Sequence, residues 1–315
     1  SENARVKIKE LSVLLKKSSQ RLKYSMANLD KEALVSNPHC IFDYSYFGLI
    51  LFRVYFKGGY ISEKDKVSII SQLSENPYVV SLYELSGEFD LAVELESPNP
   101  SKFNKELKKV ANLIPTLNNY KILLNVVTHI YPRLYLPTQE FLNLSHEIIV
   151  GGDRAVESFS PSELTVLKNL LANPKIRLTA LAKQCDMNIK TSISILKNLQ
   201  KRKIIKGFRY LVNTNKLGIF KFRLFLKLHN LSQDSEQHLM NFLLRTEEII
   251  QVSKTVGDWD IEVDIESFDK TRIRFLIIQL REEFRDLIET FNIIEFYQYY
   301  QKTYLPKYLF SNENS

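Results

Sequence analysis

The chain repeats itself at a fixed shift of 170 residues, and this repeat constrains its fold more than any other feature. Residues 87–97 lie over residues 257–267, with five of the eleven pairs identical and five more conservative. The remaining pair is Ala92 against Glu262. Further matches at the same shift run from about residue 7 to about residue 130. We therefore expect a tandem duplication, in which one two-part module is present twice.

The first part of the second copy is predicted to be helical. Apolar residues recur at three- and four-residue spacing from 161 to 172, after an N-terminal signature of Ser160, Pro161 and Glu163. Two more helices are expected at about 178–185 and 189–203. A run at 204–212, broken by Gly207, favours a short β-hairpin. Three helices and a hairpin predict a winged helix-turn-helix whose third helix suits a major groove.

The second part of each copy alternates between strands and helices. In the second copy, strands are expected at about 217–228, 248–257, 259–266 and 290–301, with helices at about 232–246 and 268–288. The order βαββαβ predicts a ferredoxin-like, four-stranded antiparallel sheet with both helices on one face. The expected fold class is therefore α+β, with winged helix-turn-helix domains plus ferredoxin-like domains in tandem.

These patterns set the expected domain boundaries. The first winged helix-turn-helix covers 1–44, its ferredoxin-like domain 45–137, and a linker 138–160. The second winged helix-turn-helix covers 161–216 and its ferredoxin-like domain 217–306. Residues equivalent to 161–170 would precede residue 1, so the first winged domain lacks its first helix in this sequence.

Positive charge is concentrated in one part of the chain. The formal net charge is +7, whereas residues 161–220 alone carry +10. Such a block favours a polyanionic partner, most simply nucleic acid, because basic side chains release condensed counterions there.

The remaining composition excludes several classes of function. No apolar run approaches the length of a membrane helix and the N-terminus has no apolar signal region, so we expect a cytoplasmic protein without membrane contact. Two cysteines and five scattered histidines do not form a metal-ligand pattern. We expect no metal, no cofactor and no catalytic residue.

The order of parts, together with the Gly-x-aromatic-Asp element at residues 87–90 and 257–260, resembles the Lrp/AsnC family of leucine-responsive-type regulators from bacteria and archaea. Residues 178–199 and 204–208 look like that family's DNA-binding half, and 217–219 look like the start of its effector domain. The resemblance implies a DNA-binding transcription regulator that is not an enzyme. It implies double-stranded DNA and an amino-acid-like effector as partners. Family members usually carry one module and pair through their effector sheets, so two modules imply an intrachain pseudo-dimer or a homodimer.

The predicted DNA contacts lie on the third helix of each winged domain and on the segment that follows it. In the second copy they are Lys190, Thr191, Ser192, Ser194, Lys197, Asn198, Lys201, Arg202, Lys206 and Arg209. In the first copy they are Ser19, Gln20, Arg21 and Lys23. Residues near the helix start would reach base edges and the lysines would contact phosphates. The alternative is a solvated basic face.

Weaker candidates for effector binding are Gly87, Asp90, Gly257 and Asp260. The alternative, which we favour, is structural: glycine supplies a positive φ angle for a tight hairpin and aspartate caps the turn.

Two other functions stay open at this point. Sirohaem decarboxylases are relatives of the Lrp/AsnC family that use the same two-domain plan in paired subunits, and they depend on His and Arg residues around a tetrapyrrole. Residues 208–213 of this chain hold no histidine, although the first copy has His39. The other alternative is an architectural DNA-binding protein with little sequence preference.

Overall fold

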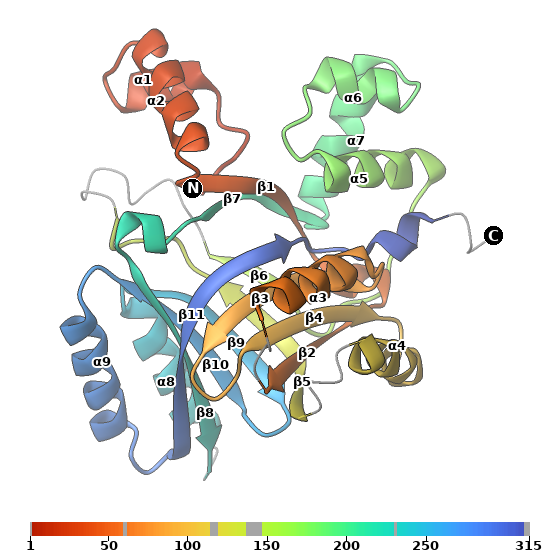
Figure 1. Cartoon of the computed structure of the whole chain (residues 1–315). Coiled ribbons are helices and arrows are strands. Elements are labelled where there is room, and N and C mark those ends of the chain that lie inside the picture. Colours follow the sequence, from red (N-terminus) through yellow and green to blue (C-terminus); the bar gives the residue numbers. More distant parts are fainter. Residues whose placement is uncertain (1, 59–61, 114–118, 137–146, 230–231, 312–315) are drawn as a thin grey trace. The chain divides into compact units, whose positions relative to one another are not determined.

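The computed structural model describes residues 2–58, 62–113, 119–136, 147–229 and 232–311. The chain divides into two compact units, each made from two separate segments (Figure 1). Unit 1 contains residues 1–43 and 158–217, and unit 2 contains residues 44–157 and 218–315. Each copy therefore contributes its first part to unit 1 and its second part to unit 2. Residues 138–146 of the predicted linker lie outside the described residues, and residues 147–157 belong to unit 2.

Unit 1 consists of helices carried on a two-stranded ribbon. The first copy supplies α1 (Ile8–Leu14), α2 (Ser19–Lys31) and β1 (Val35–Phe42). The second copy supplies α5 (Pro161–Ala172), α6 (Leu178–Gln184), α7 (Ile189–Lys201), β7 (Ile205–Val212) and the short η3 (Asn215–Leu217). In Figure 1 the two groups of helices rise from opposite ends of the β1–β7 ribbon.

The predicted hairpin at 204–212 is wrong. This segment forms the single strand β7, which pairs antiparallel with β1 of the other copy. Gly207 lies opposite Ile41 within the ladder and is absent from the positive-φ glycines of the described residues, so it does not form a turn. The sequence pattern predicts that residues 204–212 pair with one another, whereas in the structure their partner strand is β1 of the first copy.

The capping prediction for α5 is confirmed. The Ser160 hydroxyl accepts a hydrogen bond from the Glu163 amide at 3.3 Å, and the Glu163 carboxylate accepts one from the Ser160 amide at 2.8 Å. This reciprocal arrangement satisfies two amide groups that the helix itself leaves without partners. The third helix, α7, begins similarly, because Asn188 accepts a hydrogen bond from the Thr191 amide at 2.8 Å.

Unit 2 repeats the order strand, helix, strand, strand, helix, strand. The first copy supplies η1 (Tyr44–Phe47), β2 (Ile50–Lys57), α3 (Glu63–Glu75), β3 (Val79–Ser86), β4 (Leu91–Ser97), α4 (Pro100–Leu113), β5 (Asn119–Ile130) and β6 (Ile148–Gly151). The second copy supplies β8 (Phe220–Leu228), α8 (Gln233–Arg245), β9 (Ile249–Val256), β10 (Ile261–Ser267), α9 (Lys270–Glu283), β11 (Ile288–Lys302) and η4 (Lys307–Phe310).

The strands of unit 2 form a closed barrel rather than two separate sheets. Each half has the ferredoxin-like strand order, β5-β2-β4-β3 in the first and β11-β8-β10-β9 in the second. Pairing of β3 with β11 and of β5 with β9 joins the halves, so eight strands of the described part close on themselves. The two predicted four-stranded sheets are thus present, but the edge strands of one sheet pair with the edge strands of the other. This pairing leaves few unpaired strand edges.

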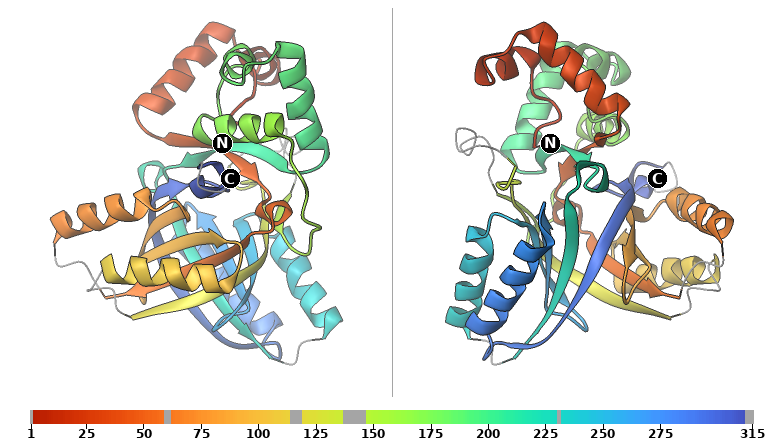
Figure 2. Two further views of the ribbon diagram at one scale, coloured as in Figure 1. Left: turned by 90° about the vertical axis from the view of Figure 1, so that its right-hand side faces the viewer. Right: turned by 60° about the vertical axis from the view of Figure 1, so that its left-hand side comes forward.

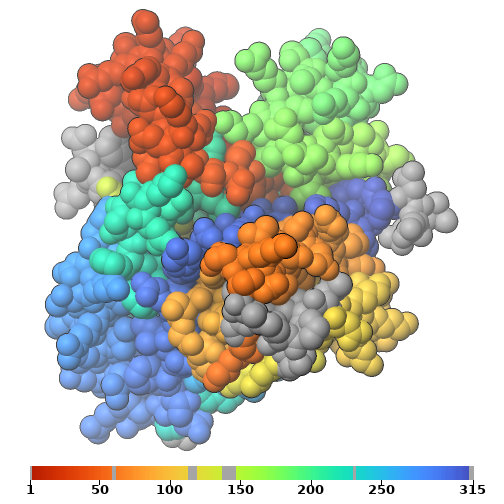
Figure 3. All heavy atoms as spheres, viewed as in Figure 1, coloured from red at the N-terminus to blue at the C-terminus, as the bar shows by residue number. Residues whose placement is uncertain are grey.

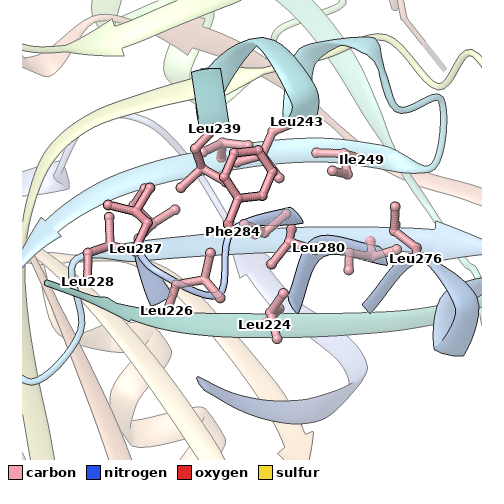
Figure 4. Packing of buried hydrophobic residues seen from close by; sticks show 14 of the residues in the cluster. Leu224, Leu226, Leu228, Leu239, Leu243, Ile249, Leu276, Leu280, Phe284 and Leu287 are labelled. Atoms are coloured by element: carbon pink, nitrogen blue, oxygen red, sulfur yellow. The ribbon is translucent and has the colours of Figure 1, made fainter. Parts of the chain in front are cut away.

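Alternation along each strand separates an outer apolar layer from the barrel interior. Leu224, Leu226 and Leu228 on β8 pack with Leu239, Leu243, Leu276 and Leu280 from α8 and α9 (Figure 4). Phe52, Val54 and Phe56 on β2 form the matching layer under α3 and α4. Figure 2 shows α8 and α9 side by side against their strands. The helices therefore cover the outside of the barrel, and the inward-facing side chains contact one another.

The surface of unit 2 carries the helices of both halves. Helix α3, orange in Figure 3, lies on this surface, and its Val67 side chain is exposed. Within the described ranges we find no helix with the length and apolar character needed to cross a bilayer.

Candidate functional site

The barrel interior of unit 2 is lined by charged residues at matched positions in its two halves. Arg53 on β2 lies directly opposite Glu94 on β4, and Arg223 on β8 lies directly opposite Asp264 on β10. All four side chains are at most 3% exposed. They point inward because they alternate with the apolar residues that face the helices.

A continuous series of hydrogen bonds crosses this interior. Arg223 binds the Asp264 carboxylate through two nitrogens, at 2.6 and 3.0 Å, and donates to the Tyr55 hydroxyl at 2.7 Å. Tyr55 donates to Glu262, which also accepts a hydrogen bond from Arg53. Arg53 in turn donates to Glu94 at 2.8 Å. A buried arginine costs little only when its donors are satisfied in this way, so the interior is a coupled network.

The network fixes the ionisation of its members. Burial alone raises the pKa of Glu94, but Lys302 and Arg53 outweigh burial and hold this pKa at about 2. Burial raises the pKa of Asp264 as well, and Arg223 and Lys221 bring it below its ordinary value. Burial disfavours the charge on Arg53, but Glu262 and Glu94 raise its pKa well above the usual range. These groups are therefore charged at neutral pH.

The interior offers little space for a ligand. A cavity of about 20 Å³ lies near Leu51, Glu94, Glu96, Gln251 and Thr303. A volume of this size accommodates roughly one water molecule. Among the described residues, this cavity is too small for a large substrate, and the charged side chains around it link the two halves of the barrel.

Unit 1 brings a histidine and an arginine together on its ribbon. His39 on β1 lies directly opposite Arg209 on β7, so their side chains share one face of the ribbon. His39 is 7% exposed and Arg209 is 6% exposed. The next pair, Cys40 with Phe208, faces the other way, and there the Arg5 guanidinium lies 5.0 Å from the centre of the Phe208 ring.

The surroundings of this pair determine what each group can do. The His39 Nδ1 atom lies 3.1 Å from the carbonyl oxygen of Asn37, which can only accept, so Nδ1 carries a proton. In the neutral ring, the Nε2 atom is then the nitrogen without a proton. Arg209 already binds a carboxylate, because its Nη2 atom lies 2.7 Å from Glu2. The pair thus combines a proton carrier with a carboxylate-binding guanidinium.

The predicted DNA contacts of the second copy separate into two groups in the structure. Lys190, Thr191, Ser194, Lys197, Asn198 and Lys201 are exposed on α7. The other four residues are buried or form ion pairs within unit 1. Ser192 is completely buried, and Arg202 forms an ion pair with Glu163. Lys206 lies 3.2 Å from Asp43, and Arg209 forms the pair described above. The structure therefore brings six of the ten residues to one exposed helix.

The predicted residues of the first copy lie at the start of α2. Ser19, Gln20, Arg21 and Lys23 are all exposed. Ser18 caps this helix, because its hydroxyl accepts a hydrogen bond from the Arg21 amide at 3.3 Å. Their positions match residues 189–193 at the start of α7, and they carry two positive charges, Arg21 and Lys23, where 189–193 carry one, Lys190.

The glycine and aspartate candidates take part in backbone turns. Gly87 and Gly257 have φ angles of 126° and 148°, which side-chain-bearing residues rarely adopt. A Cβ atom on Gly257 would lie 2.9 Å from the Ile122 carbonyl oxygen. Asp90 accepts a hydrogen bond from the Gly58 amide at 2.9 Å, and Asp260 accepts one from the Leu228 amide at 2.8 Å. These contacts match the structural alternative, and effector binding at these residues stays a prediction.

Neither the charged interior of the barrel nor the His39–Arg209 pair is predicted from the sequence. The first had a visible signal, because Glu94, Glu96, Asp264 and Glu266 alternate with apolar residues in segments otherwise typical of buried strands. The second had none, since nothing in the sequence sets the register between strands about 170 residues apart.

Comparisons with known proteins identify a similar fold that covers nearly the whole chain. No protein-family model and no curated protein matches. Among solved structures, the siroheme decarboxylase NirDL in complex with an iron-uroporphyrin III analogue matches 97% of this chain and 90% of its own. The TM-score is 0.59 and the sequence identity is 12%.

Two further matches cover about half of this chain. PH0061 matches 44% of this chain and 93% of its own, with a TM-score of 0.40 and 19% identity. The transcriptional regulator NMB0573 from Neisseria meningitidis, in complex with L-Met, matches 46% of this chain and 91% of its own, with a TM-score of 0.38 and 10% identity.

The expectation that the chain is not an enzyme is therefore wrong. The fold that matches over nearly the whole length of this chain is that of a decarboxylase. Regulation through DNA binding stays a prediction.

Proposed function

We propose that the chain is an enzyme that removes carboxyl groups from a tetrapyrrole, as the siroheme decarboxylase with the same fold does. The observation that carries the proposal is the pairing of His39 with Arg209 across β1 and β7. Each half of the chain contributes one of the two residues. A histidine and an arginine on one face of the ribbon supply the two groups that decarboxylation of a carboxylate side chain requires.

His39 and Arg209 would have separate roles in the reaction. The bond between a methylene carbon and its carboxyl carbon breaks, carbon dioxide leaves, and the electron pair stays on the tetrapyrrole side. One proton then bonds to that carbon, so an acetate side chain becomes a methyl group without net oxidation or reduction. Arg209 would bind and orient the carboxylate, as it now binds Glu2. His39 would supply the proton, because imidazole is the side chain that most often acts as a general acid in enzymes.

Incubation of the purified full chain with iron-uroporphyrin III under anaerobic conditions tests the proposal. We expect a change in the Soret band on binding, and mass spectrometry should show tetrapyrrole that has lost carbon dioxide. The His39→Ala variant should retain the Soret change and lose activity by a factor of about 10² or more. Arg209→Ala should weaken binding as well, because the carboxylate loses its charged partner.

A matched control separates this site from general damage. His238 is an exposed histidine on α8, so His238→Ala should leave binding and turnover unchanged. If the wild-type chain gives neither a Soret change nor a decarboxylated product, the proposal is wrong.

Binding of double-stranded DNA through α7 is a second candidate function. Lys190, Lys197 and Lys201 are exposed on this helix, and no ion pair holds them among the residues that the structure describes. Free lysines of this kind contact phosphates and make affinity depend steeply on salt. Fluorescence anisotropy with a random duplex should show weaker binding by Lys190→Ala and Lys197→Ala. The exposed Lys168 on α5 is the matched control, and equal loss with Lys168→Ala would contradict a specific role for α7.

A further inference from the structure

Helix α9 lies on the outside of unit 2, and the centre of its exposed face is apolar (Figure 1). Phe275 is 56% exposed and Ile278 is 41% exposed. At the shift of 170 residues, their equivalents on α4 are Lys105 and Lys108, which are also exposed. The same position in the fold is therefore a charged, solvated face in the first half and an apolar face in the second.

The basic residues of the two helices differ as well. Helix α4 carries four lysines and no arginine, whereas α9 carries one lysine and three arginines, Arg272, Arg274 and Arg281. Interfaces between proteins are enriched in arginine and aromatic residues and depleted in lysine, relative to the rest of the protein surface. The exposed face of α9 thus has the composition of an interface, and that of α4 has the composition of a solvated surface.

The charges of α9 are arranged against its helix dipole. Lys270 and Arg272 lie in the first turn, and Glu282 and Glu283 are the last two residues. An isolated helix is stabilised by the opposite arrangement, with acidic residues at its start and basic residues at its end. A second α9 packed antiparallel to the first would bring each acidic end beside a basic start. The arrangement therefore suits contact between two copies of this helix.

Two exposed charges on this face, Arg274 and Glu282, have no ion-pair partner in the part of the chain that the structure describes. They are eight residues apart, about 12 Å along the helix, and they share a face with Phe275 and Ile278. Ile278 lies midway between them. A two-fold axis at Ile278 therefore places Arg274 of each copy opposite Glu282 of the other copy.

We propose that α9 forms a contact between two copies of the chain, with the two helices antiparallel about a two-fold axis near Ile278. Such a contact is self-complementary, because two arginine–glutamate pairs flank a centre formed by Phe275 and Ile278 of both copies. Ile278 also lines a groove of about 410 Å³ with Phe222, Ile277 and Ile293, so the apolar surface extends beyond the helix. The apolar residues supply most of the binding energy, and the exposed ion pairs fix the register.

Sedimentation equilibrium of the full chain, at concentrations from about 1 to about 100 µM, tests the proposal. We expect the average mass to rise toward twice that of one chain. Phe275→Ala should weaken the dimer about tenfold or more, because it removes an aromatic side chain from the centre of the contact. Lys105→Ala, at the equivalent position of α4, is the matched control and should leave the dimer unchanged. A chain that stays monomeric throughout this range would overturn the proposal.

Exchange of the two charges tests the antiparallel arrangement. Arg274→Glu and Glu282→Arg should each weaken self-association by a factor of about ten or more, because each brings two like-charged pairs together. A mixture of these two variants should form a heterodimer, since every pair across the axis again has opposite charges. The double variant Arg274→Glu/Glu282→Arg should dimerise like the wild type for the same reason. Self-association that neither substitution weakens, or that mixing does not restore, would contradict this contact.

Vesicles distinguish a second copy of the chain from a membrane surface. Anionic phospholipid also attracts basic residues that lie beside exposed aromatic side chains. If the wild-type chain stays monomeric and sediments with vesicles of phosphatidylserine and phosphatidylcholine, whereas Phe275→Ala does not, this face binds lipid and the proposal is wrong.

Discussion

At the centre of the barrel, the two halves of the chain differ at one position that the rest of the network depends on. Ala92 on β4 and Glu262 on β10 are equivalent at the shift of 170 residues. Glu262 accepts hydrogen bonds from Arg53 and Tyr55, both of which belong to the first half. Ala92 is completely buried in the apolar cluster that also contains Tyr55 and Tyr83.

The difference shows what joining two halves in one chain permits. Two identical subunits would place either two alanines or two glutamates at these positions. Two alanines would leave Arg53 with Glu94 alone as its carboxylate partner, and two glutamates would bring like charges into one buried layer. The barrel avoids both arrangements because its halves can carry different residues. The origin of the halves by duplication remains a prediction.

The largest effect is expected from removing this asymmetry. Glu262→Ala should lower the free energy of unfolding by about 3–5 kcal/mol, because Arg53 loses a buried partner. Ala92→Glu should also destabilise the chain, since it adds a second buried carboxylate. The double variant Ala92→Glu/Glu262→Ala should recover part of the loss, as measured by denaturant unfolding. Glu289→Ala, at an exposed position of β11, is the control and should change little. A double variant less stable than both single variants would contradict the idea of one shared carboxylate.

A second comparison concerns the helices of unit 1. Leu199 on α7 is completely buried, whereas the equivalent Leu29 on α2 is 38% exposed. Leu199→Ala should therefore cost about 2–5 kcal/mol, and Leu29→Ala should cost much less, because little packing is lost. Thermal or chemical unfolding of the two variants measures the difference. Equal losses would mean that the first-copy helices are packed as well as those of the second copy.

Acid should weaken the barrel through both halves. The pKa of Glu94 in the folded chain, about 2, lies below its ordinary value of 4.5, so its ionised form stabilises the fold above about pH 4.5. This contribution is lost as the pH falls from 4.5 toward 2. The pKa of Asp264 is lowered as well, so the second half responds in the same direction. Glu94→Gln and Asp264→Asn should each flatten the dependence of stability on pH in this range. An unchanged slope in both variants would assign the acid response to other groups.

The smallest effect is expected where the halves agree. Ser62 and Ser232 are equivalent residues that cap α3 and α8, each accepting a hydrogen bond from the amide three residues later. Replacement of either one by alanine should cost about 1 kcal/mol. Differential scanning calorimetry should show similar losses for Ser62→Ala and Ser232→Ala. A clear difference between them would show that the two halves are less alike outside the barrel than inside it.

Much of the fold could be predicted from the sequence, because the signals that specify it are local. The strands and helices of the second copy begin and end within a few residues of their predicted positions, although α9 ends at Glu283 rather than near residue 288. Leucine and isoleucine periodicity identified the helices, and Ser160 with Glu163 identified the start of α5. Phe284 turns inward into the apolar layer and ends α9, which helical periodicity alone did not indicate.

The candidate site could not be predicted, because it depends on contacts between distant segments. The sequence predicts a DNA contact for Arg209, and it offers His39 only as a histidine of the first copy under the decarboxylase alternative. Their proximity follows from the β1–β7 register, which also replaces the predicted hairpin. Closure of the barrel was missed for a similar reason, since periodicity shows that a strand has a buried face but not which strand pairs at its edge.

Closure of the barrel also sets the order in which the protein can be completed during synthesis. Strand β3 pairs with β11 through Ser86 and Glu295, so about 200 residues must be added between the two partners. At typical rates of translation, this takes about 10–40 s. Throughout that time the growing chain carries β3 as an unpaired sheet edge, which is open to association with other nascent chains. Strand β11, which follows the other strands of the described residues out of the ribosome, is the one that protects this edge.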